Sequence, residues 1–145
     1  MRGVILFMVP IVNVDMIAVI VAAIAAFIVG MIWYSPMLFG KKWMKIMGVT
    51  EKDMGKNKDK MMGIMLSSLV VSGVTAYVFA HILAFSQAST ITDAVQGSVW
   101  VWLGFVATTL YMGVLYEKKS MDWYILSAGH YLFAIIAMGI VLVSL

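Results

Sequence analysis

The side chains that could do chemistry form two small groups in an otherwise apolar chain. His130 lies roughly 13 Å into the last apolar stretch at 1.5 Å per helical residue. We expect hydroxyl groups at a similar depth on the other stretches, namely Thr108, Thr109, Ser68 and Ser72. An imidazole among hydroxyls could carry a proton, bind a small polar group, or only hydrogen-bond neighbouring helices. The sequence leaves these alternatives open.

Stripes of small residues predict which helix faces meet, because helices in lipid associate through close packing and not through hydrophobic exclusion. The stripe that contains His130 is Trp123, Ser127, His130, Ala134 and Ala137. The stripe on the preceding apolar stretch is Asp93, Gly97, Trp100, Gly104, Thr108 and Tyr111. If both stripes face inward, Thr108 is the first hydrogen-bond partner that we predict for His130, and Ser72 is the second.

A second group is predicted near the opposite membrane interface, and its members are Asp15, His81, Asp93 and Gln96. Asp15 and Asp93 each begin an apolar stretch, and the spacing of Asp93 and Gln96 is that of a capping box, so helix capping is one interpretation. A histidine beside two carboxylates could instead bind a cation or respond to pH. These ligands are too few to predict a metal site, and we predict no metal and no other cofactor.

Motifs for catalysis are missing from the sequence. There is no HExxH, no GxSxG, no phosphate-binding loop and no cysteine. Because these catalytic motifs are missing, we do not expect an enzyme. No carboxylate lies near the middle of an apolar stretch either, so proton-coupled antiport through a central acid has no candidate residue.

Composition places these groups in a membrane protein. Of the 145 residues, 63% are hydrophobic and 12% are charged, whereas soluble domains are roughly half apolar and a quarter charged. Four stretches reach the roughly 20 residues that span a bilayer as helix. They cover about 15–35, 61–85, 93–116 and 121–144. The sequence predicts one all-α domain over 1–145, an integral membrane four-helix bundle.

Lysine distribution predicts the topology. The first connection holds seven lysines, the third holds Lys118 and Lys119, and the second holds none. The positive-inside rule places the first and third connections in the cytoplasm, so both termini should face outward from the cytoplasmic membrane. We read residues 1–12 as an apolar lead-in retained at the outer surface. The small net charge of +3 follows topology, and no nucleic-acid partner is expected.

The first connection predicts an interfacial helix. Phe39, Trp43, Ile46 and Met47 share one face, and the lysines of this segment occupy the others. This helix could anchor the connection or sense anionic lipid.

On the second span, small residues lie on two opposite faces, which favours a homo-oligomer, most simply a dimer.

Three segments together resemble a small bacterial and archaeal membrane family. The segments are Gly30-Met-Ile-Trp33-Tyr34-Ser35-Pro36 with Phe39-Gly40-Lys41-Lys42-Trp43, Trp102-Leu-Gly104-Phe105 through Thr108-Thr109, and Ala128-Gly129-His130-Tyr131 with Met138-Gly139. The family is domain of unknown function 1761. The resemblance implies a four-span protein of unassigned activity and transfers no catalytic residue. The positions that it marks are Trp33, Tyr34, Ser35, Pro36, Gly104 and His130.

Two classes of function remain from the sequence. The first is a binding, lipid-interacting or structural membrane component whose partners are the lipid bilayer and a second copy of the chain. The second is a minimal transporter or channel for a small solute or cation, with its pathway at a subunit interface. A water-filled cavity reaching His130 would favour transport, and a dry core would favour the structural role. Any small-molecule ligand is unspecified by these residues.

Overall fold

The computed structural model describes residues 12–56 and 58–145, and every regular element in this part is helical. Four helical segments are long and apolar enough to span a membrane: Met16–Trp33, Asp59–Phe85, Ile91–Tyr116 and Met121–Ser144. The fold is therefore all-α with four candidate spans, as the sequence predicted. The predicted lead-in lies almost entirely outside the described residues.

The helices begin at side chains that satisfy free backbone donors. The Asp15 carboxylate accepts hydrogen bonds from the amides of Ile17 and Ala18 at the start of α1 (Met16–Trp33). The Ser120 hydroxyl accepts from the Trp123 amide at the start of α7 (Met121–Ser144). The first turn of a helix leaves its amides without intrahelical acceptors, so such caps fix where the helix starts.

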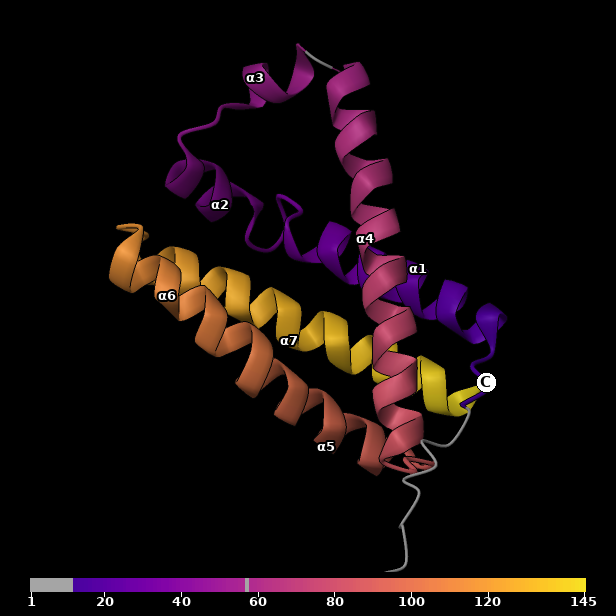
Figure 1. Cartoon of the computed structure of the whole chain (residues 1–145). Helices are drawn as coiled ribbons and strands as arrows, with labels where there is room; N and C mark the ends of the chain where they lie inside the picture. The colour runs from indigo at the N-terminus through magenta and orange to yellow at the C-terminus, as the bar shows by residue number, and fades with distance from the viewer. Residues whose placement is uncertain (1–11, 57) are drawn as a thin grey trace, which may run out of the picture.

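Helix α7 lies at the centre of the molecule. It contacts α1 on one side and the third span on the other (Figure 1). That third span consists of α5 (Ile91–Val101), the π-helix η1 (Trp102–Ala107) and α6 (Thr108–Tyr116). Ala22 of α1, Ala94 and Ser98 of α5 are fully buried in these contacts. Small side chains let the backbones approach, as the stripe of the fourth span predicts and as a similar stripe of the first span predicts, which consists of Asp15, Ala18, Ala22 and Ala25.

Helix α4 (Lys58–Phe85) crosses the other spans instead of running beside them (Figure 1). Its second half packs on α1 and buries Ala76, Phe79, Ala80 and Leu83. The first half stands away from α6 and α7 and has α3 (Glu51–Gly55) beside it. Most side chains between 62 and 71 are accordingly exposed.

The predicted inward face of the third span is wrong between Trp100 and Thr108, although Gly97 of the same stripe packs against Leu83. Trp100 is 64% exposed, and Gly104 and Thr108 are exposed as well. Ser98 faces α7 instead and packs against Gly139. A Cβ built on Gly139 would lie only 2.7 Å from the Ser98 Oγ, so the two helices are too close here for a larger side chain. The π-helix η1 then changes the helical register, since each π-turn contains an extra residue.

The lysine-rich end of the molecule carries α2, α3 and the turn between α6 and α7. Helix α2 (Gly40–Met47) is the amphipathic helix predicted in the first connection. An ion pair of 2.9 Å between Lys42 and Asp122 joins it to the start of α7. Both partners are half or more exposed, so this pair contributes about 0.2–1 kcal/mol at most.

Candidate functional site

The exit from α1 forms a tight, defined turn. The backbone amides of Leu38 and Gly40 donate to the Ser35 carbonyl, and that of Phe39 donates to the Trp33 carbonyl. A Cβ on Gly40 would collide with the Tyr34 and Ser35 backbone, so the turn requires glycine at this position. Pro36 ends the helix because it lacks an amide hydrogen. These contacts place Tyr34 and Trp43 on the same side of the turn.

Two rings and two glycines join α1 to α7 reciprocally. A Cβ built on Gly30 would lie 3.1 Å from Nε2 of His130. A Cβ built on Gly129 would lie 3.0 Å from the Trp33 ring. On each helix, therefore, a glycine leaves the space that an aromatic or imidazole ring of the other helix occupies. This arrangement holds His130 against α1 with its imidazole at the edge of the helix pair.

Aromatic side chains surround this junction. The Tyr34 and His130 ring centroids are 5.0 Å apart, and those of Tyr34 and Trp43 are 5.9 Å apart with an edge-on geometry. His130 also lies 5.1 Å from the Tyr131 ring. Such pairs add packing energy beyond the area that they bury. Tyr34 thus links His130 of the bundle to the interfacial helix α2.

A cavity of about 660 Å³ opens beside this aromatic group, between α2, α3 and the first half of α4. We call it the interfacial chamber. Its lining residues come from the α1 exit and from these three helices: Tyr34, Pro36, Gly40, Trp43, Met44, Glu51, Met54, Met61, Ile64, Met65 and Ser68. The lining is chiefly apolar, and four of its members are methionines.

A second cavity, of about 630 Å³, separates the first half of α4 from α7. We call it the α4–α7 furrow. Its lining consists of Lys60, Gly63, Ile64, Ser67, Ser68, Val71, Ser72, His130 and Tyr131. The furrow brings together three residues that the sequence predicted as one mid-membrane group, namely Ser68, Ser72 and His130. Ile64 and Ser68 line both cavities, so the furrow adjoins the chamber.

The structure does not bring Thr108 or Thr109 to this group. Their hydroxyls donate to the carbonyls of Gly104 and Phe105 on their own helix at 2.8 Å, and both side chains are exposed. The bond predicted between Thr108 and His130 is therefore wrong, because the face of the third span that carries Thr108 points away from α7. Ser72 shares the furrow with His130 without a hydrogen bond between them in the described structure.

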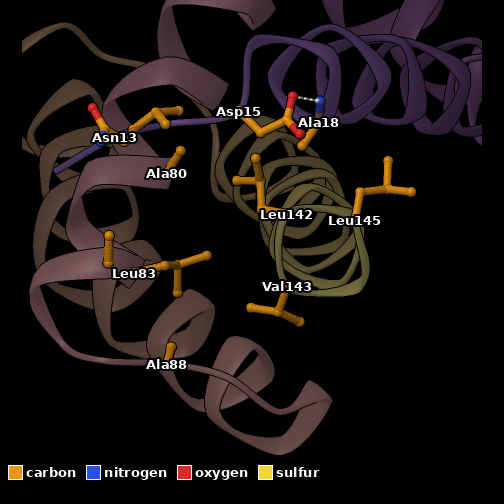
Figure 2. Close-up of a pocket in the computed structure, with 11 residues that line it drawn as sticks. Asn13, Asp15, Ala18, Ala80, Leu83, Ala88, Leu142, Val143 and Leu145 are labelled. Carbon is orange, nitrogen blue, oxygen red and sulfur yellow. Dashed lines mark hydrogen bonds between the residues drawn. The ribbon is translucent and has the colours of Figure 1, made fainter.

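The group predicted at the opposite end is dispersed. Asp15 caps α1, and Figure 2 shows its carboxylate turned toward the Ala18 amide at the edge of a cavity of about 220 Å³. Asp93 forms a capping box with Thr90 at the start of α5, although Gln96 was the partner expected from its spacing. His81 hydrogen-bonds the Tyr77 carbonyl of its own helix at 2.8 Å.

Gln96 is exposed on α5 and lines neither this cavity nor the chamber. Among residues 12–56 and 58–145, no three His, Asp or Glu side chains are placed to hold a metal ion. The local structure thus explains the acids of this end by helix capping, which was the first interpretation of their positions.

Helix α3 closes the chamber on the lysine-rich side and carries its own cap. The Thr50 hydroxyl and amide both donate to the Asp53 carboxylate, and these bonds lower the pKa of Asp53. A charged carboxylate accepts hydrogen bonds better than a protonated one. The cap defines where α3 starts and so where Glu51 and Met54 meet the chamber.

Several features of the site were missed from the sequence. The Trp102 indole donates to the Ala128 carbonyl at 2.7 Å and ties η1 to α7. The reciprocal packing of rings on glycines could have been inferred from the sequence, because each helix carries a glycine close to a ring. Gly30 lies three residues before Trp33, and Gly129 lies directly before His130. The chamber carried no comparable signal, because its methionines are spread over three separate helices.

The family model for the protein of unknown function DUF1761 matches residues 17–143. The chain belongs to this family. The DUF1761 match covers all four spans, including the α1 exit, the π-helix and the helix that carries His130. No curated protein and no solved structure matches the chain. This DUF1761 member is thus a multi-pass membrane protein, and its interfacial chamber is lined by the α1 exit, by α2 and α3 and by the start of α4.

Proposed function

We propose that this DUF1761 protein is a lipid-binding membrane component whose interfacial chamber takes an acyl chain of a lipid. The observation that carries the proposal is the chamber, which is apolar, about 660 Å³ in volume and lined by Met44, Met54, Met61 and Met65. Methionine side chains are unbranched and polarizable, so they adapt to flexible apolar ligands. A lipid chain is the flexible apolar ligand that every membrane supplies.

Charge at the chamber supports a lipid with an anionic head. Lys41 and Lys45 lie exposed on α2, which forms one wall, and Lys42 of the same helix is paired with Asp122. Basic side chains near an anionic membrane surface are each attracted by about 1 kcal/mol. Glu51 contributes a single opposing carboxylate to the chamber wall. On this proposal α2 serves as more than an anchor, because its residues Gly40, Trp43 and Met44 line the ligand site.

Photolabelling tests the proposal directly. The protein is reconstituted in nanodiscs that contain a phospholipid with a diazirine in its acyl chain, and labelled peptides are mapped by mass spectrometry. We expect labelling on the chamber walls. Met65→Trp should narrow the chamber with a rigid ring and reduce this labelling by at least about threefold. Leu66→Trp is the matched control, because Leu66 is 58% exposed and does not line the chamber.

The comparison of the two variants decides the outcome. Equal labelling of the chamber peptides in Met65→Trp and Leu66→Trp would show that chains contact this region only as bulk lipid. Melting temperatures measured in the same nanodiscs establish that both variants are folded.

A further inference from the structure

A third cavity, of about 360 Å³, adjoins the interfacial chamber beside α3 and the start of α4, and we call it the outer pocket. It shares four lining residues with the chamber, namely Trp43, Met54, Met61 and Ile64. The residues that it adds include one anionic and one cationic side chain, Asp53 and Lys60. The apolar chamber therefore continues into a smaller pocket that carries opposite charges.

The outer pocket lies nearer the membrane interface than the chamber does. Its α4 residues are Lys60, Met61 and Ile64, whereas those of the chamber are Met61, Ile64, Met65 and Ser68. At 1.5 Å per residue, Lys60 precedes Ser68 by about 12 Å along the helix. The candidate span begins one residue before Lys60, so this end of α4 is its interfacial end. A lipid with its chain in the chamber would thus have its head at the level of the outer pocket.

Asp53 and Lys60 face one small space. In the part of the chain that the structure describes, they line the outer pocket together without forming an ion pair with each other. The α4 residues of the pocket cover one helical turn, about 6 Å. The Asp53 carboxylate accepts both Thr50 bonds through Oδ2, so its Oδ1 is not needed for the cap of α3. The two charges are therefore available to one ligand.

Opposite charges on the wall favour a ligand that itself carries both signs. A phosphate accepts hydrogen bonds from the ammonium group of a lysine, and a primary ammonium group donates to a carboxylate. The head of an aminophospholipid, such as phosphoserine, carries both groups a few bonds apart. A phosphoglycerol head has no cation for Asp53, and the trimethylammonium group of phosphocholine has no N–H to donate.

We infer that the outer pocket binds the head of an aminophospholipid, with Lys60 on the phosphate and the Asp53 carboxylate on the primary ammonium. The inference rests on the proposed function and deepens it, because the chamber takes the chain and the outer pocket selects the head. Phosphatidylserine combines this ammonium with the net negative charge that Lys41 and Lys45 favour. Selection for the ammonium is the property that the outer pocket adds.

Competition between two lipids of equal net charge measures this selection. The purified protein in dodecyl maltoside is labelled with a trace of phosphatidylserine that carries a diazirine in its acyl chain. Dioleoyl phosphatidylserine or dioleoyl phosphatidylglycerol then competes. Both have the same chains and one negative charge, so general attraction to lysines cancels. We expect phosphatidylserine to compete at a concentration about tenfold lower. Equal competition by the two lipids would overturn the inference.

Asp53→Asn should remove most of this preference, because an amide keeps an acceptor for Thr50 but carries no charge. Asp59→Asn is the matched control and should keep the preference, since Asp59 is exposed at the start of α4 and lines neither cavity. An undiminished preference in Asp53→Asn would contradict the assignment of the ammonium. So would a loss of preference in Glu51→Gln alone, because Glu51 lines the chamber and not the outer pocket.

Lys60→Gln tests the phosphate contact and leaves the cap of α3 intact. It should weaken competition by both phospholipids by at least about threefold and leave competition by dioleoylglycerol, which has no phosphate, unchanged. Lys56→Gln is the matched control, because Lys56 is exposed and lines neither cavity. Equal competition curves for the two lysine variants would overturn the site at Lys60.

Two further arms separate the remaining explanations. Displacement of the probe by glycerophosphoserine at the concentration at which phosphatidylserine displaces it would overturn a lipid as the source of the bound head. Met65→Trp should weaken labelling by the probe. If it does so while the two phospholipids compete equally, the proposed chain site stands and the headgroup inference fails. If Met65→Trp has no effect, the proposed function itself fails.

Discussion

Gly139→Ala tests how closely α7 must approach its neighbours. A Cβ at this position would lie 2.7 Å from the Ser98 Oγ, 3.1 Å from a ring carbon of Phe79 and 3.2 Å from the Ala94 carbonyl oxygen. Ordinary van der Waals contact begins near 3.4 Å, so the nearest atom is about 0.7 Å too close. The Ser98 hydroxyl cannot simply turn away, because it donates to the carbonyls of Ala94 and Ile135.

The expected loss of stability follows from these contacts. Overpacking of a well-packed core costs about 1–3 kcal/mol. Disturbing the interhelical bond from Ser98 to Ile135 adds about 0.6 kcal/mol, the average for such bonds in membrane proteins. We expect Gly139→Ala to destabilise the protein by about 1.6–3.6 kcal/mol, which lowers the folding equilibrium constant by roughly 15- to 400-fold.

Reversible unfolding in detergent with increasing sodium dodecyl sulfate measures this change. Gly63→Ala is the matched control, because a Cβ at Gly63 meets nothing within 4 Å. It should change the unfolding free energy by less than about 1 kcal/mol. Equal stability of the two variants would refute the close approach of α5 and α7 at Gly139.

Three further outcomes test other parts of the molecule. Trp102→Phe removes the 2.7 Å hydrogen bond to the Ala128 carbonyl but keeps an aromatic ring, and it should lower the unfolding free energy by about 1 kcal/mol in the same assay. An unchanged unfolding free energy would mean that this hydrogen bond does not stabilise the protein. Hydrogen bonds from Thr50 lower the pKa of Asp53 in the folded protein. The Asp53 carboxylate therefore stabilises α3 fully at pH values above its pKa in the unfolded chain, and this stabilisation is lost as the pH falls through its lower pKa in the folded protein. Amide exchange in α3 should accelerate over that window in wild type and show no such step in Asp53→Asn. We propose a dimer through α4, and Gly73 lies on one of the two small-residue faces of this helix, so Gly73→Leu should shift cross-linking toward monomer; an unchanged dimer fraction would contradict the dimer. We also propose that both termini lie outside the cell, so a cysteine at residue 145 should react with an impermeant reagent added to intact cells; a protected cysteine would contradict this topology.

The sequence by itself determined the class of fold and the approximate spans. Long apolar stretches in a chain with 12% charged residues leave few alternatives, because each span must satisfy its own backbone in lipid. The α1 exit was also predictable, since Pro36 and the interfacial aromatics act locally. The inward faces of α1 and α7 followed from small residues at helical spacing, with Ala22, Ser127 and Ala134 buried as expected.

Tertiary structure decided what faces the site. A stripe drawn at 100° per residue placed Thr108 beside His130, but packing of Ser98 on Gly139 turned that face outward and η1 shifted the register beyond it. The crossing of α4 was equally invisible, because a helix with small residues on two faces can pack in more than one direction. That crossing creates both cavities, so the chamber and the furrow depend on the angle between helices and not on any local pattern.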